Sequence, residues 1–468
     1  KSGALYYPLW LIYAALYTRK GGHDIQFLDA PAKQLNEEES LAIINAHSHP
    51  NTLFVLDTST PSIKSDIAFA EEIKKSNPES FILLVGTHPS ACPEETLSLS
   101  YFVNAVAIGE YDEIVKELAD ALSAGNDVKG VSGLCYRDGE EFIRTGLMPP
   151  MRNLDELPYA AEFIKEFLDE KDYFFAAATY PSIQIFTGRG CPFRCNFCVY
   201  PQTMHGHAFR ARSAENVVGE FEYIANNFPD VKEVVIEDDT FTANKNRVKE
   251  ICRLLVEKGL NKRLRWLCNA RVDLDMETMK AMKAAGCRLI IPGIESGSQQ
   301  ILDNIKKGTR VEQFYQYVAN AKKAGLLIHA CYMVGNQGET KETMAQTLNL
   351  ALKSTRNLFN SVVVCISLNL TITYLTISST LTCKISIFSS SNPISTLSNF
   401  FPSSINLILF FPNFIFSFKF SFSFFNVFIH KSFSISFFLY SFNCSNWFLY
   451  QISLSICFLL LLLFSFSI

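Results

Sequence analysis

Three cysteines within a short segment are the feature of this sequence with the clearest chemistry. Cys191, Cys195 and Cys198 follow one another at spacings of four and three residues. Iron–sulfur clusters are held by cysteine thiolates, normally four of them, so three thiolates leave one iron with an open position, as catalytic metal sites generally have. The alternative is a zinc site, with His205 or His207 as the nearest candidates for a fourth ligand. The spacing favours the iron–sulfur cluster.

A strand precedes these cysteines in the predicted fold, and a regular repetition of helix and strand follows them. Gln184–Thr187 reads as the strand, and Gly188-Arg189-Gly190 leads from it into an irregular loop, from which three thiolates converge most easily. Periodicity predicts five βα units, and such repeats close into barrels whose chemistry collects at the carboxyl ends of the strands. The later strands are predicted at 233–237, 264–268, 288–292 and 327–334, and the helices at 214–227, 246–258, 276–284, 311–324 and 341–352.

Polar residues and glycines follow the predicted strands, where a barrel gathers its chemistry. Each of the polar residues could instead cap a helix or lie in a solvated turn. The pair Lys306-Lys307 is interpreted as a solvated surface rather than as part of a site. The candidate binding residues at the strand ends are Glu237, Asp238, Asp239, Arg271, Glu295, Ser296, Gly335 and Gly338.

The N-terminal part of the chain also alternates between predicted helices and strands. Apolar strands alternating with helices indicate an α/β fold with a doubly wound parallel sheet, whose ligands bind at the carboxyl ends of the strands. Residues 128–146 are predicted as a hairpin around Arg137-Asp138-Gly139. Strands are predicted at 24–29, 52–57, 81–85 and 103–108, and helices at 9–19, 37–45, 63–75 and 111–124.

Composition changes abruptly near residue 350. Leu352–Ile468 contains no Ala, Gly, Asp or Glu and is dominated by Phe, Ser, Leu, Ile and Asn. T-rich DNA translated out of frame or over non-coding sequence reads in this way, and a soluble fold would need glycine turns and charged residues. The alternative is a membrane anchor formed by the uncharged end Ser432–Ile468. We favour the interpretation that the tail is an artefact of translation out of frame or over non-coding sequence.

These patterns divide the chain into four segments. Residues 1–128 form the first domain, 129–180 a hairpin and a linker, 181–353 the cysteine-bearing domain with five βα units, and 354–468 a tail without a recognisable fold. The five units make a partial barrel. Their resemblance to a family of six-unit barrels implies a sixth strand, which would fall in that tail and is not predicted.

The overall charge excludes one class of function. With 42 basic and 46 acidic side chains, the net charge is −4, which argues against general nucleic-acid binding through phosphate neutralisation. The sequence shows no secretory signal, and clustered cysteines in such a chain more often bind metal than form disulfides. We therefore expect a reducing cytoplasm, with membrane association only if the tail is genuine.

Residues 181–353 resemble the core of radical S-adenosylmethionine (SAM) enzymes. The resemblance implies that Cys191, Cys195 and Cys198 bind a [4Fe–4S] cluster whose fourth iron is chelated by SAM. It further implies the following contacts with SAM: Glu237, Asp238 and Asp239 with the amino group, Arg271 with the carboxylate, Glu295 and Ser296 with the ribose, and Phe197, Gly335 and Gly338 with the adenine.

The first domain resembles the cobalamin-binding domain that precedes the core in many of these enzymes, especially in the run Gly86–Thr96. Compared with that family, one further N-terminal strand is absent, and so is the Asp-x-His-x-x-Gly motif that supplies an axial histidine. The resemblance implies that any cobalamin is held without that ligand, and His23 and His88 are interpreted as loop residues. A scaffold that binds no corrinoid is the alternative.

The combined resemblance implies an enzyme that cleaves SAM to a 5′-deoxyadenosyl radical and modifies an unactivated carbon of a small-molecule or lipid-like substrate. Methylation, cyclisation and ring contraction are among the outcomes in this family, and a one-electron donor such as flavodoxin or ferredoxin is implied. Gly188–Ser213 and Arg288–Gly308 look most like the hopanoid-tailoring enzymes and the magnesium-porphyrin cyclases. The alternatives are an inactive fragment that retains only the cluster, and a membrane-tethered radical enzyme. No catalytic residue is assigned.

Overall fold

The structure is a computed structural model that describes residues 4–356 and the strand segments 362–368, 370–371, 404–411, 414–421, 432–433 and 436–437. Its chain divides into two compact units, one of residues 1–368 with 436–468 and the other of residues 369–435. Most of the tail lies outside the described residues. The two interpretations of the tail, a frameshift and a membrane segment, therefore concern residues that the structure does not describe. Among the described residues, no helix combines the length and apolarity needed to cross a membrane.

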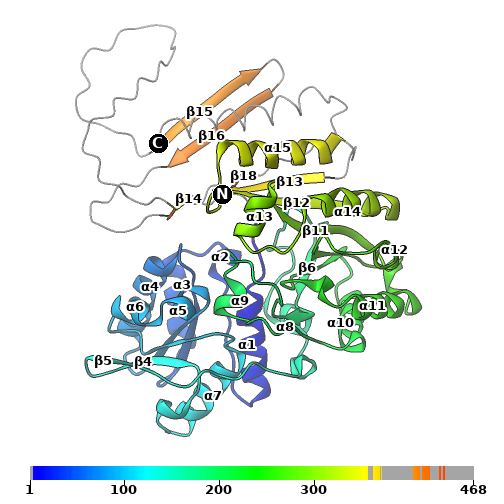
Figure 1. The fold of residues 1–468 in the computed structure, drawn as a ribbon. Coiled ribbons are helices and arrows are strands. Elements are labelled where there is room, and N and C mark those ends of the chain that lie inside the picture. The colour runs from blue at the N-terminus through cyan, green and yellow to red at the C-terminus, as the bar shows by residue number, and fades with distance from the viewer. Residues whose placement is uncertain are drawn as a thin grey trace, which may run out of the picture. The chain divides into compact units, whose positions relative to one another are not determined.

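The second unit contributes only short antiparallel strand pairs among its described residues (Figure 1). β15 (Ser404–Phe411) pairs with β16 (Phe414–Ser421), and β14 (Leu370–Thr371) pairs with β17 (Ser432–Phe433).

A five-stranded mixed sheet forms the first domain, in the strand order β1-β2-β3-β4-β5. The strands β1 (Leu53–Asp57), β2 (Phe81–Val85) and β3 (Ala105–Ala107) are parallel, and the hairpin of β4 (Leu134–Asp138) and β5 (Glu141–Arg144) continues the sheet in antiparallel fashion. The hairpin is therefore part of this sheet, whereas we predict it from sequence as a segment outside the domain.

Helices cover both faces of this sheet, which confirms the predicted doubly wound arrangement. On one face, α1 (Leu9–Lys20) and α7 (Asp112–Ser123) contribute to an apolar core. On the other face, α4 (Ile63–Ser76) and α6 (Pro93–Ser98) contribute to a second core. Since α1 also buries Leu9, Ile12 and Leu16 in the core of the following domain, it joins the two domains.

The strand predicted at 24–29 is wrong, because these residues form no strand. Their apolar side chains, Ile25 and Phe27, pack instead against the core of the second domain. The Phe27 ring meets the Phe163 ring edge-on at 4.9 Å between centroids. Alternating apolar residues thus mark a segment with one buried side, but the partner of that side is a helix and not a neighbouring strand.

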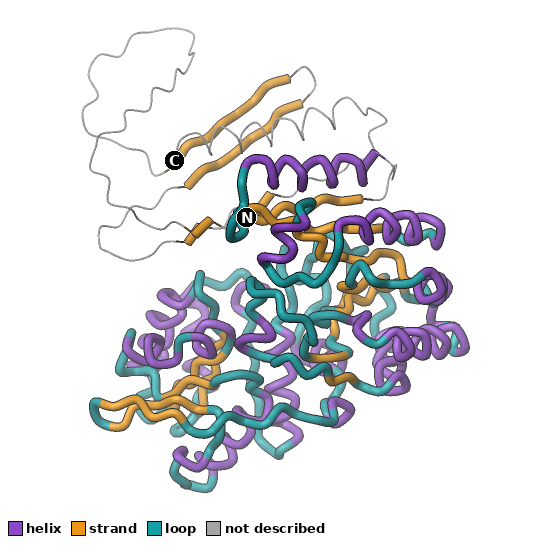
Figure 2. The backbone as a smooth tube through the Cα atoms, in the orientation of Figure 1, coloured by secondary structure: helices purple, strands orange, loops and turns teal. Residues whose placement is uncertain are grey.

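The second domain is built on a parallel sheet in chain order, β6-β9-β10-β11-β12-β13, with β18 (Ser436–Phe437) antiparallel at its end. Figure 2 distinguishes the strands from the helices around them by colour. The sequence predicts only five βα units, and this prediction is wrong, because β13 adds a sixth parallel strand beside β12. The changed composition hides it, although its three consecutive valines are typical of strands. The strand bounds are Ser182–Ile185 (β6), Glu233–Ile236 (β9), Arg265–Ala270 (β10), Cys287–Glu295 (β11), Leu327–Val334 (β12) and Val362–Leu368 (β13).

Helices return the chain between these strands, and most of them begin at a side-chain cap. Ser213, Asn244 and Asp275 each accept a hydrogen bond from a backbone N–H in the first turn of the helix that follows, which satisfies an otherwise unpaired donor. The helices are α10 (Ala214–Asn227), α11 (Lys245–Glu257), α12 (Met276–Ala284), α13 (Gln299–Asn304), α14 (Val311–Ala324) and α15 (Lys341–Arg356). Short elements complete the fold: α2 (Ala30–Lys33), α3 (Glu37–His47), α5 (Thr87–Ala91), α8 (Ala160–Phe167), β7 (Gly188–Arg189), α9 (Tyr200–Thr203) and β8 (Arg210–Ala211).

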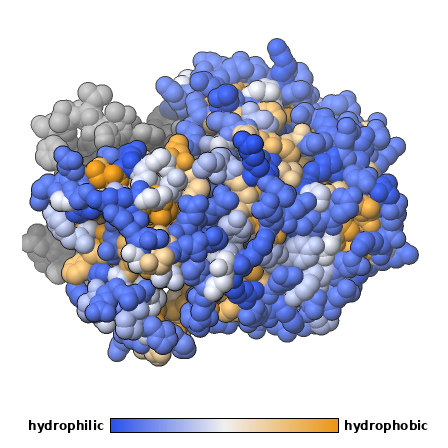
Figure 3. Space-filling view, turned by 90° about the horizontal axis from the view of Figure 1, so that it is seen from below, coloured by the Kyte–Doolittle hydropathy of each residue, from blue (hydrophilic) through white to orange (hydrophobic). Residues whose placement is uncertain are grey.

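Apolar side chains are concentrated inside both domains. The core of the second domain runs continuously from α1 to the strands of the barrel. Hydrophilic residues dominate the face seen in Figure 3, and apolar residues on it are scattered, as is usual for a folded protein surface.

Candidate active site

The three cysteines lie in a long hairpin between β7 and β8, the residues 188–211, which we call the cluster hairpin. All three thiols are free and partly buried. Gly190, beside Cys191, has φ 85°, and a Cβ there would lie 2.2 Å from the Ala208 carbonyl oxygen. The two sides of the hairpin therefore approach closely only because residue 190 is glycine.

The cysteines fit an iron–sulfur cluster in their chemistry. Burial is the main cause that raises the pKa of Cys198 to about 11, and Asp239, Cys191 and Cys195 add to it. This thiol is consequently protonated without iron, and cations would stabilise the thiolate. Among the described residues, no three His, Cys, Asp or Glu side chains are close enough to hold a single metal ion. A cluster does not require that arrangement, because each thiolate binds a different iron.

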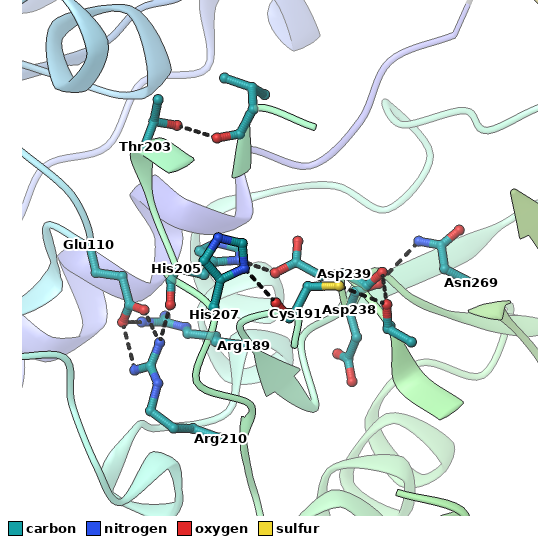
Figure 4. Close-up of polar contacts among 12 residues, drawn as sticks. Glu110, Arg189, Cys191, Thr203, His205, His207, Arg210, Asp238, Asp239 and Asn269 are labelled. Atoms are coloured by element: carbon teal, nitrogen blue, oxygen red, sulfur yellow. Dashed lines mark hydrogen bonds and ion pairs between the residues drawn. The ribbon is translucent and has the colours of Figure 1, made fainter. Parts of the chain in front are cut away.

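The acidic run that follows β9 is divided among three environments, and Figure 4 shows Asp238 and Asp239 among the residues around Cys191. Asp238 is fully buried and accepts two hydrogen bonds from Thr187, from the backbone N–H and from the hydroxyl, both at 2.6 Å. Asp239 pairs with the imidazole Nδ1 of His205. Glu237 accepts only one hydrogen bond, from Gln184 at 3.3 Å. Glu237 and Asp239 thus each have one side-chain partner among the described residues, and the Glu237 contact is the longest of those made by the three carboxylates.

Glu237 should make stability pH-dependent. Burial first, and then the charge of Asp238, raise its pKa to about 7. Because the folded protein holds this proton more tightly than the unfolded chain, stability is greatest below the ordinary pKa of a glutamate and falls as pH rises toward 7. From about pH 5 to about pH 8, we expect the free energy of unfolding of wild type to fall by about 1–2 kcal/mol relative to that of Glu237→Gln. Urea unfolding measures both values. Parallel pH curves for the two proteins would contradict this expectation, and Glu215→Gln on the surface serves as the control.

Arg271 follows β10 and lies against the cluster hairpin. Its guanidinium carbon is 3.4 Å from the centre of the Phe193 ring, between the first two cysteines. One Nη donates to the Lys307 carbonyl at 2.8 Å, while the buried Nε has no partner. Since a buried donor without a partner is costly, this guanidinium has unused capacity for an anionic ligand.

Glu295, at the end of β11, is held by a residue that the sequence did not single out for the site. Lys307 donates to its carboxylate at 2.7 Å, and both side chains are only 9% exposed. Glu295 has φ 67°, a conformation in which non-glycine residues are strained and which often occurs at functional sites. The interpretation of Lys307 as a solvated residue is therefore wrong, whereas Lys306 is exposed.

Three further candidates are engaged within the chain. The Ser296 hydroxyl lies 3.1 Å from the Thr347 hydroxyl and accepts from the Ser298 N–H. Gly335 donates its N–H to the Glu339 carboxylate. Gly338 has φ 81°, and a Cβ there would lie 2.8 Å from the Asn304 amide nitrogen.

Phe197, between the last two cysteines, packs on a small apolar cluster after β11. The cluster contains Ile301, Leu302 and Ile305, and the Lys307 ammonium lies 5.8 Å from the centre of the Phe197 ring. Hydrogen bonds from Asn196 to the carbonyls of residues 304 and 305 fix the same contact. The cluster hairpin is thus fastened to the turn that follows α13.

The carboxyl edge of the first sheet fits a polar ligand in its chemistry. Gly86 has φ 109°, and a Cβ there would lie 2.3 Å from an oxygen of Asp57. His88 pairs through Nδ1 with the Thr60 hydroxyl at 3.1 Å, and its buried Nε2 has no partner. His23 instead pairs with Asp120 on the surface, at 2.7 Å. Gly86, which has no side chain, and the unpaired Nε2 of His88 therefore lie close together in sequence, and a large polar cofactor could approach the first and bond to the second.

The cluster hairpin also touches this edge. The Ser90 hydroxyl lies 3.7 Å from the Met204 sulfur, and a cavity of about 370 Å³ opens beside them, lined among others by Gly109, Met151 and His205. The hairpin and the loops that follow the first sheet thus both line this cavity.

Comparison with known proteins identifies both domains. A family model described as the radical SAM superfamily matches residues 185–351, and one described as the B12 binding domain matches residues 1–119. The chain is 33% identical over 348 residues to an uncharacterized methyltransferase of Pyrococcus horikoshii, covering 74% of this chain and 73% of that protein. The chain belongs to the radical SAM superfamily, in the group whose barrel follows a B12-binding domain.

Other relatives point to two kinds of reaction. The anaerobic magnesium-protoporphyrin IX monomethyl ester cyclase of Cereibacter sphaeroides is 28% identical over 355 residues, 74% of this chain and 56% of that protein. Cytidylyl-2-hydroxyethylphosphonate methyltransferase of Streptomyces wedmorensis is 23% identical over 406 residues, 74% of this chain and 73% of the relative. The predicted likeness to the magnesium-porphyrin cyclases is confirmed, and the chain spans just over half the length of the Cereibacter cyclase.

Solved structures confirm the two-domain fold. The radical SAM methyltransferase TsrM of Kitasatospora setae, with cobalamin and a [4Fe–4S] cluster bound, superposes with a TM-score of 0.65 at 20% identity, over 79% of this chain and 70% of that one. The cobalamin-dependent radical SAM enzyme OxsB gives a TM-score of 0.65 at 18% identity, over 75% and 50%. Family membership assigns a [4Fe–4S] cluster, SAM and cobalamin as cofactors and defines the chain as an enzyme.

Proposed function

We propose that this protein transfers a methyl group to an unactivated carbon of a small-molecule or lipid-like substrate. Support comes from the methyltransferase that is 33% identical and from one observation, the contact of the cluster hairpin with the carboxyl edge of the first sheet at Ser90 and Met204. Cyclisation is the second candidate, because the magnesium-porphyrin cyclase relatives cover the same 74% of the chain.

The residues of this chain would bind and orient the cofactors. Cys191, Cys195 and Cys198 would ligate the cluster. When bound, the cluster supplies an electron for the reductive cleavage of SAM, and cobalamin supplies a methyl carrier. Glu237 would accept from the amino group of SAM and Arg271 would pair with its carboxylate, since their side chains have the unused capacity described above.

Other residues would position the nucleoside and exclude water. Glu295, held by Lys307, would accept from the ribose hydroxyls. Phe197 would lie beside the adenine, and the backbone at Gly335 and Gly338 would follow its edge. Asp238, Asp239 and Ser296 would act indirectly, because their polar atoms already have partners in the chain.

An anaerobic assay of the full chain tests the proposal. Reconstituted protein with SAM, hydroxocobalamin and a chemical reductant should release 5′-deoxyadenosine, and a methyltransferase should also release S-adenosylhomocysteine. 5′-Deoxyadenosine alone would favour cyclisation. Neither product from protein with an intact cluster would contradict the enzymatic proposal for this chain.

The setting of the reaction is part of the proposal. A reducing cytoplasm would keep the free thiols available, and flavodoxin or ferredoxin would supply the electron in the cell. The net charge of −4 offers no general attraction for nucleic acid.

A further inference from the structure

The base of the cluster hairpin carries two arginines that face each other. Arg189 of β7 and Arg210 of β8 are directly paired residues of the antiparallel ladder. Their side chains are 1% and 11% exposed. Like charges opposite one another in a ladder are destabilising, and burial removes the solvent that would screen them. The base of the hairpin therefore requires anions from elsewhere.

Both anions come from the first domain. The guanidinium of Arg189 donates to both carboxylate oxygens of Asp112, at 2.6 and 3.1 Å, and to Glu110 at 3.1 Å. Arg210 donates through both terminal nitrogens to Glu110, once at 3.1 Å. Glu110 is thus the group that both arginines share (Figure 4). Burial opposes its ionisation, but Arg189 and Arg210 outweigh that effect and lower the pKa of Glu110.

Glu110 lies at the carboxyl edge of the first sheet, where we expect the ligand of that sheet to bind. It follows Gly109 after the end of β3, and the Gly109 N–H donates to the Ser90 hydroxyl at 3.0 Å. On the hairpin side, Arg210 also donates to the His205 carbonyl at 3.1 Å, and the His205 ring pairs with Asp239 at the end of β9. Hydrogen bonds and ion pairs therefore connect the edge of the first sheet, through Glu110, to the hairpin that carries the cysteines.

We propose that Glu110 is a positioning residue that couples the two cofactor sites, so that cobalamin at the edge of the first sheet and the cluster in the hairpin each strengthen binding of the other. This inference rests on the proposed function, because it requires both cofactors. Glu110 acts by fixing Arg189 and Arg210, and through them the shape of the hairpin, and it need not touch either cofactor.

Binding of hydroxocobalamin to the full chain, with and without a reconstituted cluster, tests the coupling. In wild type we expect the cluster to lower the hydroxocobalamin Kd about tenfold, within the usual range for coupled sites. In Glu110→Gln the two Kd values should agree within about twofold. Glu117→Gln, an exposed change on α7, the helix that follows Glu110, should retain the wild-type ratio.

A double variant separates positioning from simple loss of stability. Glu110→Gln alone leaves an excess cation at the hairpin base, whereas Glu110→Gln with Arg210→Gln leaves Arg189 balanced by Asp112. The double variant should therefore fold and retain its cluster, but with a Kd ratio near one. If it regains the wild-type ratio, Glu110 is merely structural and the proposal is overturned.

Two further outcomes are distinguishable. A wild-type ratio of one with normal hydroxocobalamin binding overturns the coupling and leaves the proposed function intact. Failure of wild type to bind hydroxocobalamin at all contradicts the proposed function and, with it, this inference.

Discussion

Replacing Cys198 by alanine is expected to abolish cluster assembly, with bound iron falling from about four atoms to fewer than about one per chain. The chain offers three thiolates at the hairpin, and the described residues contain no group of His, Cys, Asp and Glu that could hold a metal in their place. Loss of one ligand therefore leaves two, too few to hold the cluster. Iron analysis and the visible absorbance of anaerobically reconstituted protein measure the effect, and reductive cleavage of SAM should fall to background.

A second cysteine provides the matched control for this experiment. Cys92 is also free and partly buried, but lies between α5 and α6 of the first domain. Cys92→Ala should bind as much iron as wild type. Retention of a full cluster in Cys198→Ala would mean that another group ligates the iron and would overturn the assignment of the three cysteines.

Lys307→Met is expected to destabilise the fold by about 3–5 kcal/mol, because it leaves a buried carboxylate without its cation. Lys307 and Glu295 are each 9% exposed and joined at 2.7 Å, so water cannot easily replace the lost partner. Urea unfolding of the metal-free protein measures the change. A separate effect should appear in the reconstituted protein as weaker SAM binding, because Glu295 loses its fixed orientation.

The neighbouring lysine and a double variant test the reason given for this effect. Lys306→Met, at an exposed position, should change stability by no more than about 0.5 kcal/mol. Glu295→Gln combined with Lys307→Met removes both charges and should recover most of the stability. If Lys306→Met and Lys307→Met are equally mild, the ion pair does not stabilise the strand end as its burial indicates.

Local periodicity was sufficient for most of the barrel elements. The helices Ala214–Asn227, Met276–Ala284 and Val311–Ala324 have the bounds predicted from sequence, and so does the strand Leu327–Val334. The residues that cap these elements or form their apolar faces lie within or next to each element, so the sequence shows them directly. The strand at 24–29 failed because periodicity indicates that one side is buried, but not whether a strand or a helix buries it.

The partners of the polar residues could not be predicted in the same way. Asp238 and Glu237 are adjacent and chemically similar, yet one is engaged by Thr187 and the other is largely unpartnered. Lys306 and Lys307 are identical neighbours, of which only the second is buried. Burial and pairing depend on strands that are distant in sequence, so residue type and spacing leave them open.

The sequence by itself determined the class of chemistry and the two α/β domains, because cysteine spacing and strand–helix repetition are local properties that survive without tertiary information. Only the tertiary structure decided which side chains remain available and how the domains are joined. Glu110 and Arg189 lie 79 residues apart, and nothing in the composition of either segment indicates that they meet. Each charge is stable alone in water, but folding buries both of them, and a buried charge is strongly destabilising unless an opposite charge lies beside it.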